Sequence, residues 1–97
     1  MNRVNYLLEC ASEECAEVIQ RISKALRFGL NEIQPGQELT NAQRLEYELH
    51  DLYAIIDLIA QEGIISKYIN DEAIDAKQEK VEKYYNYSKE LGVVSES

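Results

Sequence analysis

Apolar side chains recur every three or four positions through the first 28 residues, which predicts a long amphipathic helix from about Arg3 to Phe28. Gly29 is expected to end this helix, because glycine adopts positive φ angles without steric cost. The predicted apolar stripe consists of Val4, Leu8, Ala11, Cys15, Val18, Ile22 and Ala25, and it is widened by Leu7, Ile19 and Leu26.

Two further helices are predicted from capping signals. Thr40 and Gln43 form a capping-box pattern, in which each side chain bonds the other's backbone amide, so the second helix starts at Thr40. Asn70 is expected to cap a third helix that ends at Gly92. Residues 64–69 are interpreted as a connector or a short extra helix.

Helix-breaking residues are scarce, with one Pro and four Gly among 97 residues. The pattern therefore predicts an all-α fold: one domain over residues 1–97, built as an antiparallel bundle of three long helices plus a short connector helix. Residues 52–60 are apolar on nearly every side, and a helix of that kind must be covered on every side. A chain this small cannot supply all of that cover, so self-association is expected.

Four carboxylates fall into two pairs, each on its own helix. Glu14 and Glu17 are three residues apart, as are Glu48 and Asp51, so each pair projects from one helix face. Gathering four carboxylates without a cation is disfavoured by like-charge repulsion, whereas oxygen-only ligation suits Mg²⁺ or Mn²⁺. The alternative is that these are ordinary solvated helix charges.

The EExxE pattern ending at Glu17, followed by ExxD from Glu48 to Asp51, resembles the all-α nucleoside triphosphate pyrophosphohydrolases of the MazG type. The words Ser23-Lys24-Ala25-Leu26-Arg27-Phe28-Gly29, Thr40-Asn41 and Tyr47-Glu48-Leu49-His50-Asp51-Leu52 are also similar to small single-domain members. The resemblance covers most of the chain. It implies a homodimer or homotetramer that splits (deoxy)nucleoside triphosphates into monophosphate and pyrophosphate with Mg²⁺ or Mn²⁺.

In such a site the metal ligands would be Glu14, Glu17, Glu48 and Asp51. Glu13 lies one step from Glu14 and is interpreted with it as catalytic, since either could accept a proton from the attacking water. Two alternatives remain open: a dUTP- or phosphoribosyl-ATP-type substrate cleaved by the same site, and a helical interaction module with no turnover.

Two polar residues of the first two helices are candidates for substrate binding. Lys24 lies two turns beyond Glu17, roughly 10 Å along the helix axis, where a cation can contact a phosphate tail. Its alternative is a plain surface lysine. Asn41 is interpreted as a second polar contact below the carboxylates, or as a residue that simply suits a helix start.

The third helix supplies three more candidates for substrate binding. Lys77 and Tyr84 fall inside its apolar arc and Lys80 lies beside it, and a lysine on such a face needs an anionic partner unless its ammonium reaches water. The lysines are interpreted as phosphate contacts and Tyr84 as a nucleoside contact or a core residue. The buried face of this helix is expected to comprise Ile74, Val81, Tyr85 and Ser88.

The charge balance narrows the class of partner. With 18 acidic and 10 basic residues the net charge is −8, and no basic stripe suited to nucleic acid is present. No 18-residue apolar run or signal peptide is recognised, so no membrane association is expected. Cys10 and Cys15 are five residues apart on one helix and cannot pair with each other, which suits a reducing cytoplasm.

Overall fold

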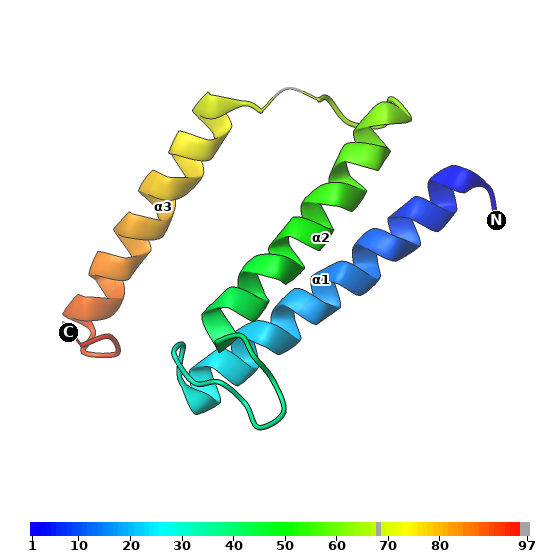
Figure 1. The fold of residues 1–97 in the computed structure, drawn as a ribbon. Coiled ribbons are helices and arrows are strands. Elements are labelled where there is room, and N and C mark those ends of the chain that lie inside the picture. The colour runs from blue at the N-terminus through cyan, green and yellow to red at the C-terminus, as the bar shows by residue number, and fades with distance from the viewer. Residues whose placement is uncertain (68, 96–97) are drawn as a thin grey trace. The chain divides into compact units, whose positions relative to one another are not determined.

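The computed structural model describes residues 1–67 and 69–95. Within these residues the chain forms three α-helices: α1 (Arg3–Phe28), α2 (Asn41–Gln61) and α3 (Asp71–Glu90) (Figure 1). The predicted all-α class is thus confirmed. The chain divides into two compact units, residues 1–67 with α1 and α2, and residues 68–97 with α3.

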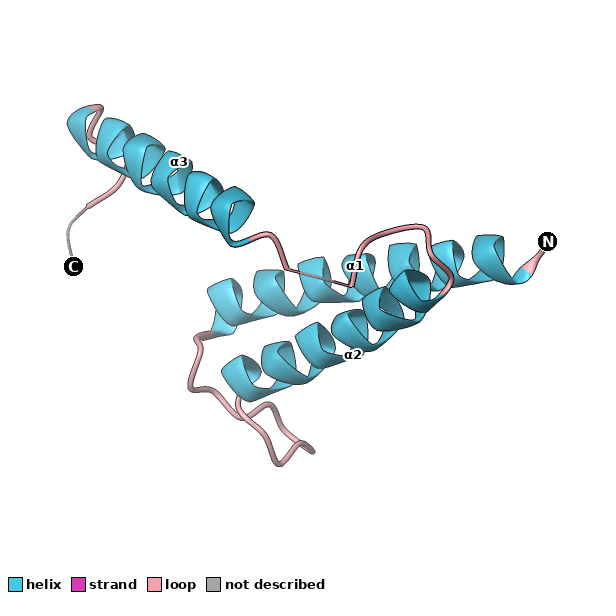
Figure 2. Ribbon diagram, turned by 90° about the horizontal axis from the view of Figure 1, so that it is seen from above, coloured by secondary structure: helices cyan, strands magenta, loops and turns pink. Residues whose placement is uncertain are grey.

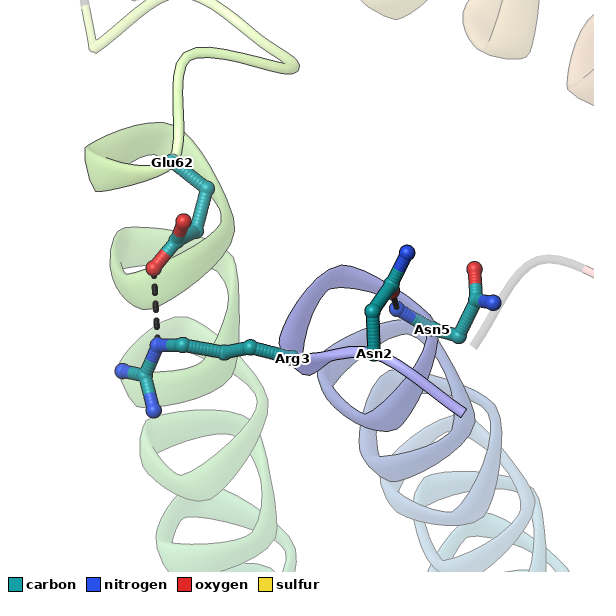
Figure 3. Close-up of polar contacts among 4 residues, drawn as sticks. All are labelled: Asn2, Arg3, Asn5 and Glu62. Atoms are coloured by element: carbon teal, nitrogen blue, oxygen red, sulfur yellow. Dashed lines mark hydrogen bonds and ion pairs between the residues drawn. The ribbon is translucent and has the colours of Figure 1, made fainter.

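The second and third helices begin directly after their predicted capping residues, Thr40 and Asn70, and α1 begins after Asn2, for which no cap was predicted. Thr40 forms the full capping box, with the Gln43 amide donating to Thr40 Oγ1 at 3.1 Å and the Thr40 amide donating to Gln43 Oε1 at 2.9 Å. The Asn70 side chain accepts from the Ala73 amide at 3.0 Å. In α1 the Asn2 side chain accepts from the Asn5 amide at 2.8 Å (Figure 3). Local side-chain bonds therefore determine where all three helices start.

The predicted connector helix is absent from the described residues between α2 and α3. Gly63 takes a φ of 82° just after α2, and the residues from 64 to 67 form bends and coil. A helix of one turn lacks the hydrogen bonds to offset its own nucleation, and the exposed side chains of Ile64 and Ile65 provide no packing that would stabilise it.

Helices α1 and α2 pack side by side and antiparallel as a hairpin (Figures 1 and 2). Their facing positions, which we call the seam, follow alternating steps of three and four residues, and each is buried or half-buried. The seam comprises Val4, Leu7, Ala11, Glu14, Val18, Arg21 and Ala25 of α1 and Leu45, Glu48, Leu52, Ile55 and Ile59 of α2.

The predicted apolar stripe of α1 is displaced by one position along part of the helix. Leu8, Cys15 and Ile22 were expected inside but are exposed, and the seam takes Leu7, Glu14 and Arg21 in their place. The hairpin therefore buries polar side chains beside its apolar ones, and leaves an apolar strip outside. Among the described residues the buried hydrophobic side chains are Leu7, Ala25, Ile59 and Ala60.

Polar contacts tie the hairpin at both ends. At the open end, Arg3 Nε donates to Glu62 Oε1 at 2.7 Å, joining the start of α1 to the end of α2 (Figure 3). Both side chains are partly solvated, so the pair contributes little energy and mainly restricts how the ends separate.

At the loop end, Asn41 is only 2% exposed, less than any other buried residue that the structure describes. Its Nδ2 donates to the Gly29 carbonyl at 2.8 Å and to Glu32 Oε1 at 3.2 Å, and its backbone amide donates to the Glu32 carbonyl at 3.0 Å. These bonds hold the end of α1 against the start of α2. Asn41 is thus committed to the loop, and its predicted contact with substrate stays a prediction.

Helix α3, taken by itself, is a 20-residue amphipathic helix with Asp71 and Glu72 in its first turn, where acids stabilise the helix dipole. None of its residues is buried. Ile74, Val81 and Tyr85 were expected to form a buried face but are 42–52% exposed, because a lone helix has no second surface within its own unit.

We predict that Asn41→Asp lowers the free energy of unfolding by about 2–3 kcal/mol, because it replaces a buried donor by an acceptor facing two oxygens. Urea denaturation followed by helical circular dichroism measures the change. Asn31→Asp, an exposed substitution in the same loop, is the matched control and should cost less than about 0.5 kcal/mol. Equal stability of the two variants would contradict the role assigned to Asn41.

Candidate metal centre

Three glutamates converge midway along the hairpin. Helix α1 presents Glu14 and Glu17 one turn apart, and α2 presents Glu48 from the opposite side of the seam. One carboxylate oxygen from each lies within 4.8 Å of the other two, and all three residues are half-buried. We call Glu14, Glu17 and Glu48 the carboxylate cluster.

The cluster is electrostatically strained. Burial raises the pKa of Glu14, and repulsion from Glu17, Asp51 and Glu13 raises it further. Burial also raises the pKa of Glu48, followed by a hydrogen bond shared with the Glu17 carboxyl group and by repulsion from its acidic neighbours. Protonation is one way of relieving this strain, and a bound cation is another.

Two carboxylate oxygens of the cluster carry no partner. Glu14 Oε2 and Glu48 Oε2 are both buried and accept no hydrogen bond within the described part of the chain. A buried acceptor without a donor is costly, and a divalent cation would satisfy both atoms. Oxygen ligands of an octahedral Mg²⁺ lie roughly 3 Å apart when adjacent and roughly 4.2 Å apart when opposite, so cluster oxygens within 4.8 Å of one another would draw closer to share one ion.

The donor set fits a hard cation. All three cluster members offer carboxylate oxygen, and neither cysteine nor histidine joins them among the described residues. Oxygen-only ligation favours Mg²⁺ or Mn²⁺ over zinc or copper. The residues present are thus suited to the predicted metal.

The structure brings together three of the four predicted ligands. Asp51 is exposed and outside the group within 4.8 Å, yet it is near enough to raise the pKa of both Glu14 and Glu48. Glu13 is exposed next to Glu14 and acts on it in the same way. Asp51, predicted as a fourth metal ligand, and Glu13, predicted as catalytic, therefore border the cluster without entering it.

The predicted substrate contacts lie on different elements. Lys24 is half-buried and shares a shallow groove of about 550 Å³ along α1 with Glu13 and Glu17. Lys77, Lys80 and Tyr84 belong to α3, in the second unit, where all three are exposed. Their roles in binding stay predictions.

Two arginines close to the cluster were not singled out by sequence reasoning. Arg21 and Arg44 line a cleft of about 370 Å³ together with Glu17 and Glu48, and we call it the arginine cleft. The signal was present in the spacing, because Arg21 follows Glu17 by four residues and Arg44 precedes Glu48 by four. For Arg21 the signal was missed because the predicted apolar stripe of the first helix lies one position away from the seam.

Comparison with protein families, with curated proteins and with solved structures finds no match for this chain. A search of the described residues for a membrane span finds no helix with the length and apolar character required. The site is therefore interpreted from its own residues.

We predict that, with divalent cations chelated, the free energy of unfolding falls as pH rises above the ordinary glutamate value of 4.5. Glu14 and Glu48 have a raised pKa in the folded state, so over this window the folded chain holds protons that the unfolded chain has released. Stability must then decrease toward neutral pH. Urea denaturation between about pH 5 and pH 8 measures the slope.

In the same experiment, Glu48→Gln should flatten the slope and raise stability at neutral pH, because it removes one of the repelling charges. Glu46→Gln, an exposed substitution two positions earlier, should keep the wild-type slope. Stability that rises with pH over this window in the wild-type protein would contradict the strained cluster.

Proposed function

We propose that this protein is a MazG-like nucleoside triphosphate pyrophosphohydrolase that requires Mg²⁺, with Mn²⁺ as a substitute. The observation that carries the proposal is the carboxylate cluster, in which three glutamates from two helices place oxygens within 4.8 Å and leave two buried acceptors unsatisfied. The EExxE and ExxD motifs that supply these residues support the same assignment.

In this proposal Glu14, Glu17 and Glu48 hold the metal, with Asp51 at its border. The metal would supply charge neutralisation for the triphosphate and lower the pKa of a bound water. Glu13, which is exposed beside Glu14, would accept a proton from the attacking water, and Glu14 is the alternative base. The reaction yields a nucleoside monophosphate and pyrophosphate, and needs no covalent nucleophile.

The acidity of the chain is consistent with a substrate delivered as its metal complex, and we place the protein in the cytoplasm on its two free cysteines. A related substrate, dUTP or phosphoribosyl-ATP, would use the same cluster. A non-catalytic helical module would use the cluster only as surface charge, although two buried unsatisfied oxygens are a poor fit to solvated charge.

We predict that purified protein releases pyrophosphate from at least one common (d)NTP with Mg²⁺, and that Glu48→Gln lowers kcat by at least about a hundredfold. A pyrophosphate-release assay across the (d)NTPs, dUTP and phosphoribosyl-ATP identifies the substrate. Glu46→Gln is the matched control on the same helix and should retain wild-type turnover.

Calorimetric titration with Mg²⁺ and Mn²⁺ accompanies the assay. Metal binding that is lost in Glu48→Gln, with helix content retained, supports the cluster as the site. No pyrophosphate release from any of these nucleotides, together with no metal binding, would leave the interaction module as the better account.

We also propose that the protein assembles as a homodimer or homotetramer through α1. Leu8, Ile19, Ile22 and Leu26 share one face of this helix and are 46, 68, 43 and 81% exposed. Each is large and apolar, and together they form a strip that continues over most of the helix. A continuous apolar strip of this kind marks an interaction surface more often than scattered single residues do.

We predict that the wild-type protein sediments as a dimer or tetramer and that Leu26→Glu shifts it toward the monomer, because a charge in an apolar interface must be desolvated. Sedimentation velocity at micromolar concentration measures the state. Gln37→Glu adds the same charge in the exposed loop and should leave assembly unchanged. A wild-type monomer throughout this range would overturn the proposal.

A further inference from the structure

A second kind of charge lies beside the carboxylate cluster. Arg21 is only 8% exposed, and its Nη1 atom is buried with no hydrogen-bond partner among the described residues. A guanidinium cannot give up its charge and carries five N–H donors, so a buried arginine without an acceptor is costly. A ligand that supplies an acceptor to Arg21 Nη1 would remove this cost.

Arg21 lines the arginine cleft, as does Arg44 from the opposite helix. Arg44 Nη1 donates to Gln34 Oε1 at 2.9 Å, and this bond holds the Arg44 side chain against the loop between α1 and α2. One bond leaves most of the Arg44 donors available. The Glu17 and Glu48 carboxylates line the same cleft, but within the described residues neither forms an ion pair with Arg21 or Arg44. An anion placed between the two guanidinium groups would reduce their mutual repulsion.

The spacing relates this cleft to the cluster. Arg21 lies one turn beyond Glu17 on α1, and Arg44 lies one turn before Glu48 on α2. Because the helices are antiparallel, both arginines lie on the loop side of the glutamates, roughly 6 Å along the helix axes. An acidic level is therefore followed by a basic level within one continuous site.

We infer that the arginine cleft binds the phosphoryl oxygens of a metal-complexed anion, with pyrophosphate as its simplest form, and that Arg21 is the main donor. A ligand that spans both levels needs cation-binding oxygens at one end and further oxygens about one helical turn away. A diphosphate group has both, whereas a carboxylate has only two adjacent oxygens. The assignment of this anion to the leaving group of the reaction rests on the proposed function.

A purely compensating role for Arg21 has a different structural signature. An arginine that neutralised the cluster would be paired with Glu17 or Glu48, and within the described residues no ion pair within 4.0 Å joins Arg21 to either. Arginine forms bidentate bonds to phosphate readily, and such charge-assisted bonds are strong in a partly buried cleft.

The test is calorimetric titration of inorganic pyrophosphate into the full-length protein with saturating Mg²⁺, and without it. The wild type should bind pyrophosphate with Mg²⁺ and much more weakly without it, because the bare anion is repelled by the cluster. Arg21→Gln should weaken binding by about ten- to a hundredfold. Arg27→Gln, an exposed arginine on the same helix, is the matched control and should bind as the wild type does.

Two further variants keep the inference falsifiable if Arg21→Gln fails to fold by circular dichroism. Arg21→Lys keeps the charge but loses the planar fork, and should bind several-fold more weakly than the wild type. Arg44→Gln removes the second arginine and should weaken binding by about tenfold. Acetate titrated under the same conditions should show no Arg21-dependent binding.

The outcomes separate this inference from the proposed function. If pyrophosphate binding depends on Arg21 but the protein cleaves no nucleotide, the anion site is supported and the proposed enzymatic function is contradicted. If the protein cleaves nucleotides but its Arg21 and Arg44 variants bind pyrophosphate as tightly as Arg27→Gln does, the anion site is overturned and the proposed enzymatic function is retained. Wild-type protein that binds no pyrophosphate in Mg²⁺ also overturns it.

Discussion

Mutual repulsion among Glu14, Glu17 and Glu48 is the constraint on which the rest of the hairpin depends. Glu14 and Glu48 occupy the middle of the seam and Glu17 lies beside them, whereas the other seam residues, apart from Arg21, are apolar. The hairpin accordingly loses apolar contact at its centre and is tied at its ends, by Asn41 at the loop and by Arg3 with Glu62 at the opening. The cluster therefore lowers the stability of the hairpin at its centre.

The alternation of charge along the hairpin explains how so small a protein can offer a polar site. Two helices present only a narrow contact surface, yet one turn of each is enough to change from glutamate to arginine. A ligand with a positive and a negative part can therefore match the hairpin without a glycine-rich loop. The neighbouring acidic and basic groups are consistent with the nucleotide chemistry proposed for the protein, because a metal–phosphate complex also has a positive and a negative part.

Local signals in the sequence predicted much of the fold. The starts of all three helices follow from short-range bonds such as that between Thr40 and Gln43, and α1 ends before Gly29 as expected. The orientation of α1 was less predictable, because Leu7 and Leu8 are both apolar and only the facing helix decides which is buried. The three glutamates of the carboxylate cluster were predicted as neighbours and lie together, since their spacing holds for any close pairing of the helices. The buried state of Arg21 and Asn41 depends on the partner helix and on the loop path, and neither can be read from periodicity.

The one-turn alternation of glutamate and arginine has a consequence for how the hairpin forms. Sliding α2 by one turn along α1 in one direction would place Arg44 opposite Glu17, and in the other direction Glu48 opposite Arg21. In either misaligned register a glutamate would face an arginine, and attraction would replace the repulsion between like charges. The native alignment therefore competes during folding with alignments in which these charges are paired. The bonds from Asn41 to Gly29 and Glu32 fix the start of α2 relative to the end of α1, and they therefore favour the native register. The loop thus holds the helices in the alignment that brings like charges close to each other.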